Sequence, residues 1–165
     1  MYISSDTNIW IDFKTINAIS LPFKLQNNYV MSNDAIQDEL LSPYELKDEL
    51  LCLGLIPINL DDSDLLLVYQ YGSKYTQLSA YDTFAMAIAK NRNYILLTGD
   101  GNLRKVALAE GVMVRGTLWI FDELFSNGYL TKIEYLQYLK EIKKYNGRQI
   151  RLPSVEIQKR IDMLK

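Results

Sequence analysis

Short apolar runs alternate with amphipathic stretches along this chain of 165 residues, and this alternation constrains the fold more than any other feature. The stretches between the runs have helical spacing, as where Phe84, Ala85, Ile88 and Ala89 form one apolar stripe. Strands separated by helices predict a parallel sheet that is covered on both faces. We therefore expect an α/β fold. The predicted strands are residues 2–5, 29–31, 55–58, 94–98 and 112–114.

The composition excludes several kinds of chemistry. The chain has no histidine and a single cysteine, Cys52, so imidazole-based catalysis, a disulfide within the chain and a structural zinc site are all excluded. No apolar run approaches the roughly 20 residues needed to span a bilayer, and the start MYISSDTNIW has no signal-peptide pattern. We expect a cytoplasmic protein without membrane contact, whose chemistry uses carboxylates, hydroxyls, amides, basic side chains or a hard metal ion.

The net charge of −2 is unevenly distributed. Residues 1–131 carry 9 Lys+Arg and 16 Asp+Glu, a net charge of −7, whereas residues 132–165 carry 9 and 4, a net charge of +5. A basic tail is compatible with a bound polyanion and equally with a solvated helix face. The basic residues that form a candidate nucleic-acid surface are Arg104, Lys105, Arg115, Lys140, Lys143, Lys144, Arg148 and Arg151.

The chain shows no internal repeat, no low-complexity segment and no linker between domains. The strongest internal break is at Asn146 and Gly147, within the basic tail. We expect one domain formed by residues 1–130, with a C-terminal helical extension, residues 131–165, packed on the same domain.

Two aspartates follow predicted strands. Asp6 comes after the first strand, and Asp100 comes after the strand in YILLTGDGN. Ligands bind at the carboxyl ends of the strands in open parallel sheets, so the two carboxylates converge if these strands are neighbours. Each also has a local explanation, because Asp6 can cap the following helix and Asp100, between two glycines, can belong to a turn.

Two further carboxylates lie on predicted helices. Asp82 is three residues after Ser79, so it can close a capping box at the start of its helix. Glu39 is about two turns into its helix, where it can be a solvated residue beside Asp38. Neither residue is informative alone, and the functional interpretation depends on the whole set and its order.

Taken in order, five stretches of the chain resemble the PIN domain family over roughly residues 1–130. They are SSDTNIWIDF, SNDAIQDEL, LSAYDTFAMAIA, ILLTGDGNLRKVALAEGV and GTLWIFDEL. The resemblance implies a three-layer α/β/α sandwich with a central parallel sheet of four to five strands, and metal-dependent cleavage of RNA. By motif match, the acidic cluster of the family corresponds to Asp6, Glu39, Asp82 and Asp100, and its polar helpers correspond to Asn8 and Thr98.

The resemblance also implies partners and a cofactor. The closing GTLWIFDELFSNGYLT is similar to the end of small bacterial and archaeal PIN proteins, among them VapC-like toxins, so a small antitoxin protein and a homodimer are expected. Several carboxylates packed together repel one another, and a divalent cation relieves this repulsion. Oxygen ligands suit Mg²⁺ or Mn²⁺. One departure from the family is the pair Gly99 and Gly101, where many relatives have bulkier or acidic residues.

Two other functions stay open from the sequence. A haloacid-dehalogenase-type phosphatase also begins with a strand-end aspartate, but it requires a second aspartate at the position of Asn8 and a well-placed lysine. A non-catalytic PIN-like domain that binds RNA or acts as a scaffold would use the basic tail instead. Metal binding without cleavage of any RNA would favour that function.

Overall fold

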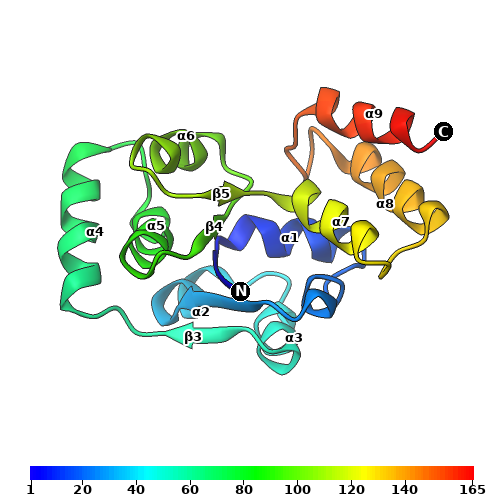
Figure 1. Cartoon of the computed structure of the whole chain (residues 1–165). Coiled ribbons are helices and arrows are strands. Elements are labelled where there is room, and N and C mark those ends of the chain that lie inside the picture. The colour runs from blue at the N-terminus through cyan, green and yellow to red at the C-terminus, as the bar shows by residue number, and fades with distance from the viewer.

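The computed structural model of this chain describes residues 1–165, and its centre is a five-stranded parallel sheet (Figure 1). The strand order is β3-β2-β1-β4-β5, and every neighbouring pair is parallel. The predicted parallel sheet is therefore confirmed. The strands are β1 (Tyr2–Ser5), β2 (Asn28–Ser32), β3 (Ile56–Ile58), β4 (Ile95–Leu97) and β5 (Val114–Arg115).

Nine α-helices and one short 3₁₀ segment connect and cover these strands. None of the helices is both long and apolar enough to cross a membrane. The elements are α1 (Thr7–Thr15), the 3₁₀ segment η1 (Pro22–Leu25), α2 (Asn33–Glu39), α3 (Leu46–Leu53), α4 (Asp62–Lys74), α5 (Ala80–Arg92), α6 (Gly101–Ala109), α7 (Thr117–Ser126), α8 (Lys132–Tyr145) and α9 (Ser154–Met163).

The two faces of the sheet carry separate apolar cores, because successive side chains of a strand point to opposite faces. Ile3 and Leu97 belong to the larger core, which also contains buried residues of α1, α2, α3, α7, α8 and α9. Leu96 and Val114 belong to the smaller core with residues of α4, α5 and α6. The expected three-layer α/β/α sandwich is confirmed by this arrangement.

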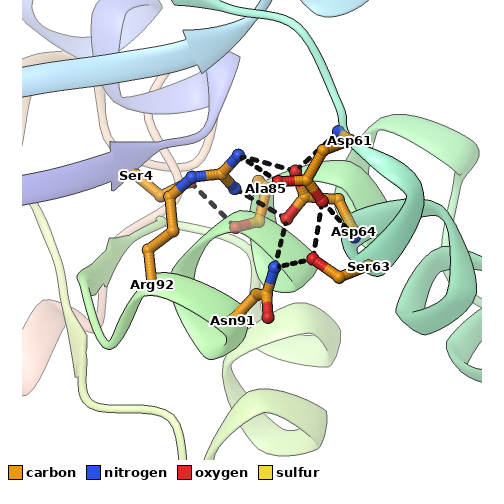
Figure 2. Close-up of polar contacts among 7 residues, drawn as sticks. All are labelled: Ser4, Asp61, Ser63, Asp64, Ala85, Asn91 and Arg92. Atoms are coloured by element: carbon orange, nitrogen blue, oxygen red, sulfur yellow. Dashed lines mark hydrogen bonds and ion pairs between the residues drawn. The ribbon is translucent and has the colours of Figure 1, made fainter.

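A polar network joins α4 to α5 at the side of the molecule away from the C-terminus (Figures 1 and 2). Asp64 is completely buried, and its two carboxylate oxygens accept hydrogen bonds of 2.6 and 2.7 Å from Arg92. Asn91 donates a further bond of 3.0 Å to Asp64, whose carboxylate also accepts from the backbone N–H of Asp61 at 3.0 Å. This buried carboxylate therefore has both a cation and a full set of donors within the chain.

The C-terminal helices pack on the same core as the N-terminal helices. Tyr135 and Leu139 of α8 and Ile157 of α9 belong to the larger core, together with Phe13 of α1. In Figure 1 helices α8 and α9 lie near α7, at the end of the molecule opposite α4. The loop between them returns towards the sheet. The division of the chain at residue 130 stays a prediction, because both parts share one core.

Candidate active site at the ends of β1 and β4

Asp6 lies at the middle of the carboxyl edge of the sheet, because it follows β1, which has β2 on one side and β4 on the other. The backbone N–H of Asp6 donates to the Leu97 carbonyl at 2.9 Å, which continues the pairing of β1 with β4. From β1 the chain continues to β2 and β3 on one side of β1, and it then crosses to β4 and β5 on the other side. This is the switch point at which open α/β sheets bind ligands.

The carboxylate of Asp6 is buried without a cation. Its side chain accepts hydrogen bonds from Thr98 Oγ1 at 2.9 Å and from Asn8 Nδ2 at 3.3 Å, and the residue is only 6% exposed. No Lys or Arg forms an ion pair with it. Burial raises the pKa of Asp6 to about 7, the Thr98 bond opposes this rise, and the charges of Asp82 and Glu39 add to it.

Glu39, at the end of α2, faces Asp6 across a small cleft. Its Oε2 accepts a hydrogen bond of 2.6 Å from Thr7 Oγ1, so it is not a freely solvated helix residue. Burial raises the pKa of Glu39, and the nearby charges of Asp82 and Asp38 raise it further. The cleft that Asp6 and Glu39 line has a volume of about 10 Å³. That is close to the space which one water molecule needs.

Asp82 and Asp100 both take part in helix capping, which the sequence predicted for Asp82 but not for Asp100, where it predicted a turn. Asp6, for which a cap was also predicted, precedes α1 but makes no side-chain capping bond. Asp82 Oδ2 accepts from the Ser79 backbone N–H at 2.8 Å and closes a capping box at the start of α5. Asp100 Oδ1 accepts from the Leu103 N–H at 2.7 Å at the start of α6. Each of these bonds uses one carboxylate oxygen. Capping therefore leaves the second oxygen of each group available for another role.

The Thr98 hydroxyl links the ends of the two strands. It donates to Asp6, and it accepts a bond of 3.0 Å from the backbone N–H of Asp100. Asn8 also contacts Asp6 directly. The predicted residues thus lie at one edge of the sheet, but they form no single compact cluster. Nowhere in the chain do three or more Asp, Glu or Cys side chains gather in a group that could hold a metal ion.

Asp12 is a buried carboxylate near this site that the sequence analysis missed. It is 6% exposed and accepts a hydrogen bond of 2.7 Å from Thr117 Oγ1. Burial raises the pKa of Asp12 to about 6. Asp12 comes four residues after Asn8, so the two share one face of α1, and this spacing is a signal that could have identified it. Both residues line a cavity of about 420 Å³, together with Asp100, Arg148 and Arg151.

The residues of the predicted basic surface fall into two groups, arginines that line a cavity and lysines that do not. Arg148 and Arg151 line the cavity beside Asp100, and Arg104 lines a second cavity that adjoins it. The lysines line neither cavity. Lys143 donates to Gln158 and Lys144 pairs with Glu141, while Lys105 and Lys140 are exposed. A nucleic-acid role for these lysines stays a prediction.

The oxygen atoms around Asp6 that could act as metal ligands suit a hard cation that keeps part of its water. They are all oxygens, and the two that face the small cleft, Asp6 and Glu39, have no cation of their own. Mg²⁺ usually takes one or two protein carboxylates and retains several waters, so a pair of carboxylates satisfies it. The residues present therefore fit Mg²⁺ or Mn²⁺ better than a cation that needs a complete protein cage.

By its fold and site, this protein is a three-layer parallel α/β domain that has carboxylates at the switch point of its sheet. A sequence model of the PIN domain family matches residues 2–164, so the chain belongs to the PIN domain family. The suspected resemblance is thereby confirmed, and the match extends through the C-terminal helices. Comparison with curated proteins and with solved structures gives no match.

Proposed function

We propose that this protein is a metal-dependent endoribonuclease that hydrolyses phosphodiester bonds of RNA at the ends of β1 and β4. The observation that carries the proposal is Asp6, a carboxylate that is buried at the switch point, stands near two other carboxylates and lacks a cation within the chain. Membership of the PIN domain family supports the same activity. A chain without histidine also has few other routes to hydrolysis.

In this proposal Asp6 and Glu39 hold Mg²⁺ or Mn²⁺, and Asp82 and Asp100 reach it through bound water. A divalent cation there supplies Lewis-acid activation of water and of the phosphate. Thr98 fixes the orientation of the Asp6 carboxylate by donating to Oδ2. Asn8 donates to the same oxygen, and its second amide N–H is free to donate to a phosphate oxygen.

A cleavage assay on a mixed RNA pool tests this function. Purified protein is incubated with Mn²⁺, Mg²⁺ or EDTA, beside the variants Asp6→Asn and Asp100→Asn. Because partners outside the ligand shell already cost about 10–100-fold when removed, we expect Asp6→Asn to lower the cleavage rate by at least about 100-fold. The matched control is Asp48→Asn, an exposed position on α3. Cleavage that survives EDTA and Asp6→Asn would remove the proposed activity.

A second candidate is a non-catalytic PIN-like domain that binds RNA. It is favoured by one observation, namely that Asp82 and Asp100 are already occupied as helix caps and that no three carboxylates form a metal-holding group. Folded protein that binds RNA and a divalent cation, yet cleaves no RNA in the pool, would support this candidate. A phosphatase is disfavoured because the amide of Asn8 contacts Asp6 where that chemistry needs a carboxyl group.

The biological setting that we propose is the toxin of a toxin–antitoxin pair, with a small antitoxin protein as partner and a homodimer as the assembled form. The family resemblance of the sequence supports it. Expression with and without a co-expressed antitoxin tests the first part through cell growth, and light scattering of the purified protein tests the second. Unimpaired growth with an enzyme that cleaves RNA in vitro would contradict the toxin role.

A further inference from the structure

A second cavity, of about 530 Å³, opens beside the candidate active site. Gly99, Gly101 and Arg151 line both this cavity and the 420 Å³ cavity next to Asp100, so the two adjoin each other. We call the second cavity the arginine groove. The arginines that line it are Arg104, Arg115, Arg151 and Arg160.

Three of these four arginines have no acidic partner. Arg160 is neutralised, since it pairs with Asp122 at 2.6 Å and with Glu156 at 2.9 Å. Arg104, Arg115 and Arg151 take part in no ion pair of the chain. Burial and the positive charge of Arg115 lower the pKa of Arg104. The groove thus holds neighbouring cations that a bound anion would relieve.

The position of Arg104 depends on two features of the backbone. Its Nη2 donates to the Thr98 carbonyl at 3.1 Å, so it is anchored to the residue that orients Asp6. A Cβ at Gly116 would lie only 2.8 Å from that same nitrogen. Gly116 therefore leaves the space which the guanidinium occupies.

The position of Arg151 depends on the loop between α8 and α9. The Asn146 side chain donates to the Leu152 carbonyl at 2.9 Å and accepts from the Leu152 N–H at 2.8 Å. These two bonds close the loop next to Arg151. The C-terminal segment thereby contributes a basic wall to a groove whose other wall comes from α6, β5 and α7.

An aromatic side chain lies in the same groove. Trp119 of α7 lines it and is partly exposed, and the Arg115 guanidinium lies 5.9 Å from the centre of its ring. Cations that follow a backbone, combined with an aromatic face on which a base can stack, are typical of sites for single-stranded nucleic acid. Bases within a duplex are already stacked, so an aromatic face of this kind selects an unpaired strand.

We propose that the arginine groove binds single-stranded RNA next to the cleavage point, with phosphates on Arg104, Arg115 and Arg151 and one unpaired base on Trp119. The proposal rests on the proposed ribonuclease function, and it adds the residues of this chain that hold the RNA strand. It also gives the C-terminal segment a direct role in substrate binding through Arg151.

The test is RNA binding without cleavage, measured in EDTA by fluorescence anisotropy of a labelled single-stranded 12-mer at several salt concentrations. We expect Arg104→Gln, Arg115→Gln and Arg151→Gln each to weaken binding several-fold. Each should also reduce the slope of log K against log salt by about 0.7, the value for one phosphate contact on a single strand. Trp119→Leu should weaken binding by about 5–100-fold with the slope unchanged.

Two variants act as controls. Lys132→Gln removes an exposed charge outside both cavities, at a position that is not part of the predicted basic surface, and should leave the affinity and the slope within error. Gly116→Ala keeps every charge but makes the Arg104 guanidinium move from its place at the Thr98 carbonyl, so it should weaken binding by less than Arg104→Gln does. Circular dichroism of each variant verifies that the fold is retained.

The outcomes separate this proposal from the proposed function. Wild-type affinity in all three arginine variants, an equal loss in Lys132→Gln, or equal competition by a duplex of the same sequence would contradict RNA binding by the arginine groove, even if the protein cleaves RNA. RNA binding that depends on the arginines, in a protein that cleaves no RNA, would support RNA binding by the arginine groove and would contradict the proposed ribonuclease activity.

Discussion

Two buried aspartates in this chain have opposite surroundings. Asp64 is completely buried and Asp6 is 6% exposed, so both are removed from water. Asp64 accepts two hydrogen bonds from Arg92 and one from Asn91 (Figure 2). The side-chain donors to Asp6 are a hydroxyl and an amide, and neither of them is a cation. A charge taken out of water is costly unless it is paired and hydrogen-bonded, so Asp6 carries a cost that Asp64 does not.

We interpret the difference as that between a structural carboxylate and the carboxylate of the proposed active site. The network of Asp64 joins α4 to α5 and is complete within the chain. The site of Asp6 has two further carboxylates whose charges raise its pKa, and no Lys or Arg of the chain pairs with it. Four predictions, from the largest expected effect to the smallest, test whether this contrast is real.

Arg92→Gln should destabilise the protein by about 3–5 kcal/mol, because it leaves Asp64 buried and uncompensated. Urea denaturation measures the change. The matched control is Lys74→Gln, because Lys74 is largely exposed and a surface pair such as that of Lys74 with Glu110 contributes far less to stability. Equal losses in the two variants would mean that the Asp64 network is no more important than a surface pair.

Asp6→Asn, in contrast, should stabilise the protein. The amide keeps the size of the side chain and removes a buried charge that has no cation, so we expect a gain of about 1–3 kcal/mol at pH 7.5 in metal-free buffer. Urea denaturation in EDTA measures the gain, and Asp48→Asn is the exposed control. A loss of stability comparable to that of Arg92→Gln would show that the chain already compensates Asp6.

The advantage of Asp6→Asn should depend on pH. The pKa of Asp6 is about 7 in the folded chain, against a usual value of 3.8. Between these values the folded state binds more protons than the unfolded state, so the stability of the wild type falls as the pH rises. We expect the gap between wild type and variant to grow by at most about 1.4 kcal/mol per pH unit from about pH 4 and to level off above about pH 7. A gap that is constant across this range would contradict the raised pKa.

Glu39→Gln should give the smallest effect. Neutralising Glu39 should stabilise the folded protein, as for Asp6, because burial and neighbouring charges raise the pKa of Glu39. The effect is smaller because Glu39 is only half-buried. The glutamine oxygen can still accept from Thr7, so we expect a gain of less than about 1 kcal/mol in metal-free buffer. Denaturation of the double variant with Asp6→Asn checks whether the two sites are coupled. Strictly additive gains would mean that they do not share one site.

The sequence predicts the sheet and its switch point well, because both follow from local patterns. Short apolar runs predict parallel strands, and β1 and β4 prove to be neighbours, which places Asp6 and Asp100 at one edge. As the alternative to catalysis, the sequence offered a capping box for Asp82 and a turn for Asp100. The structure shows that capping occupies only one oxygen of each group.

The parts that the sequence did not predict depend on distant segments. Asp12 becomes a buried neighbour of the site through a hydrogen bond to Thr117, which is 105 residues away along the chain. Arg151 reaches the groove only because Asn146 closes the loop after α8. Residue type and spacing identify candidates within one element, but they do not say which elements later converge.

The most direct test of the account is the melting temperature in EDTA, Mg²⁺ and Mn²⁺ at pH 7.5, for the wild type and Asp6→Asn. A cation that binds only the folded state stabilises it by about 2.7 kcal/mol at 100 times its dissociation constant. We predict that Mg²⁺ and Mn²⁺ raise the melting temperature of the wild type and leave that of Asp6→Asn unchanged. Equal increases in both proteins, or none in the wild type, would contradict the claim that Asp6 takes its counter-charge from a divalent cation.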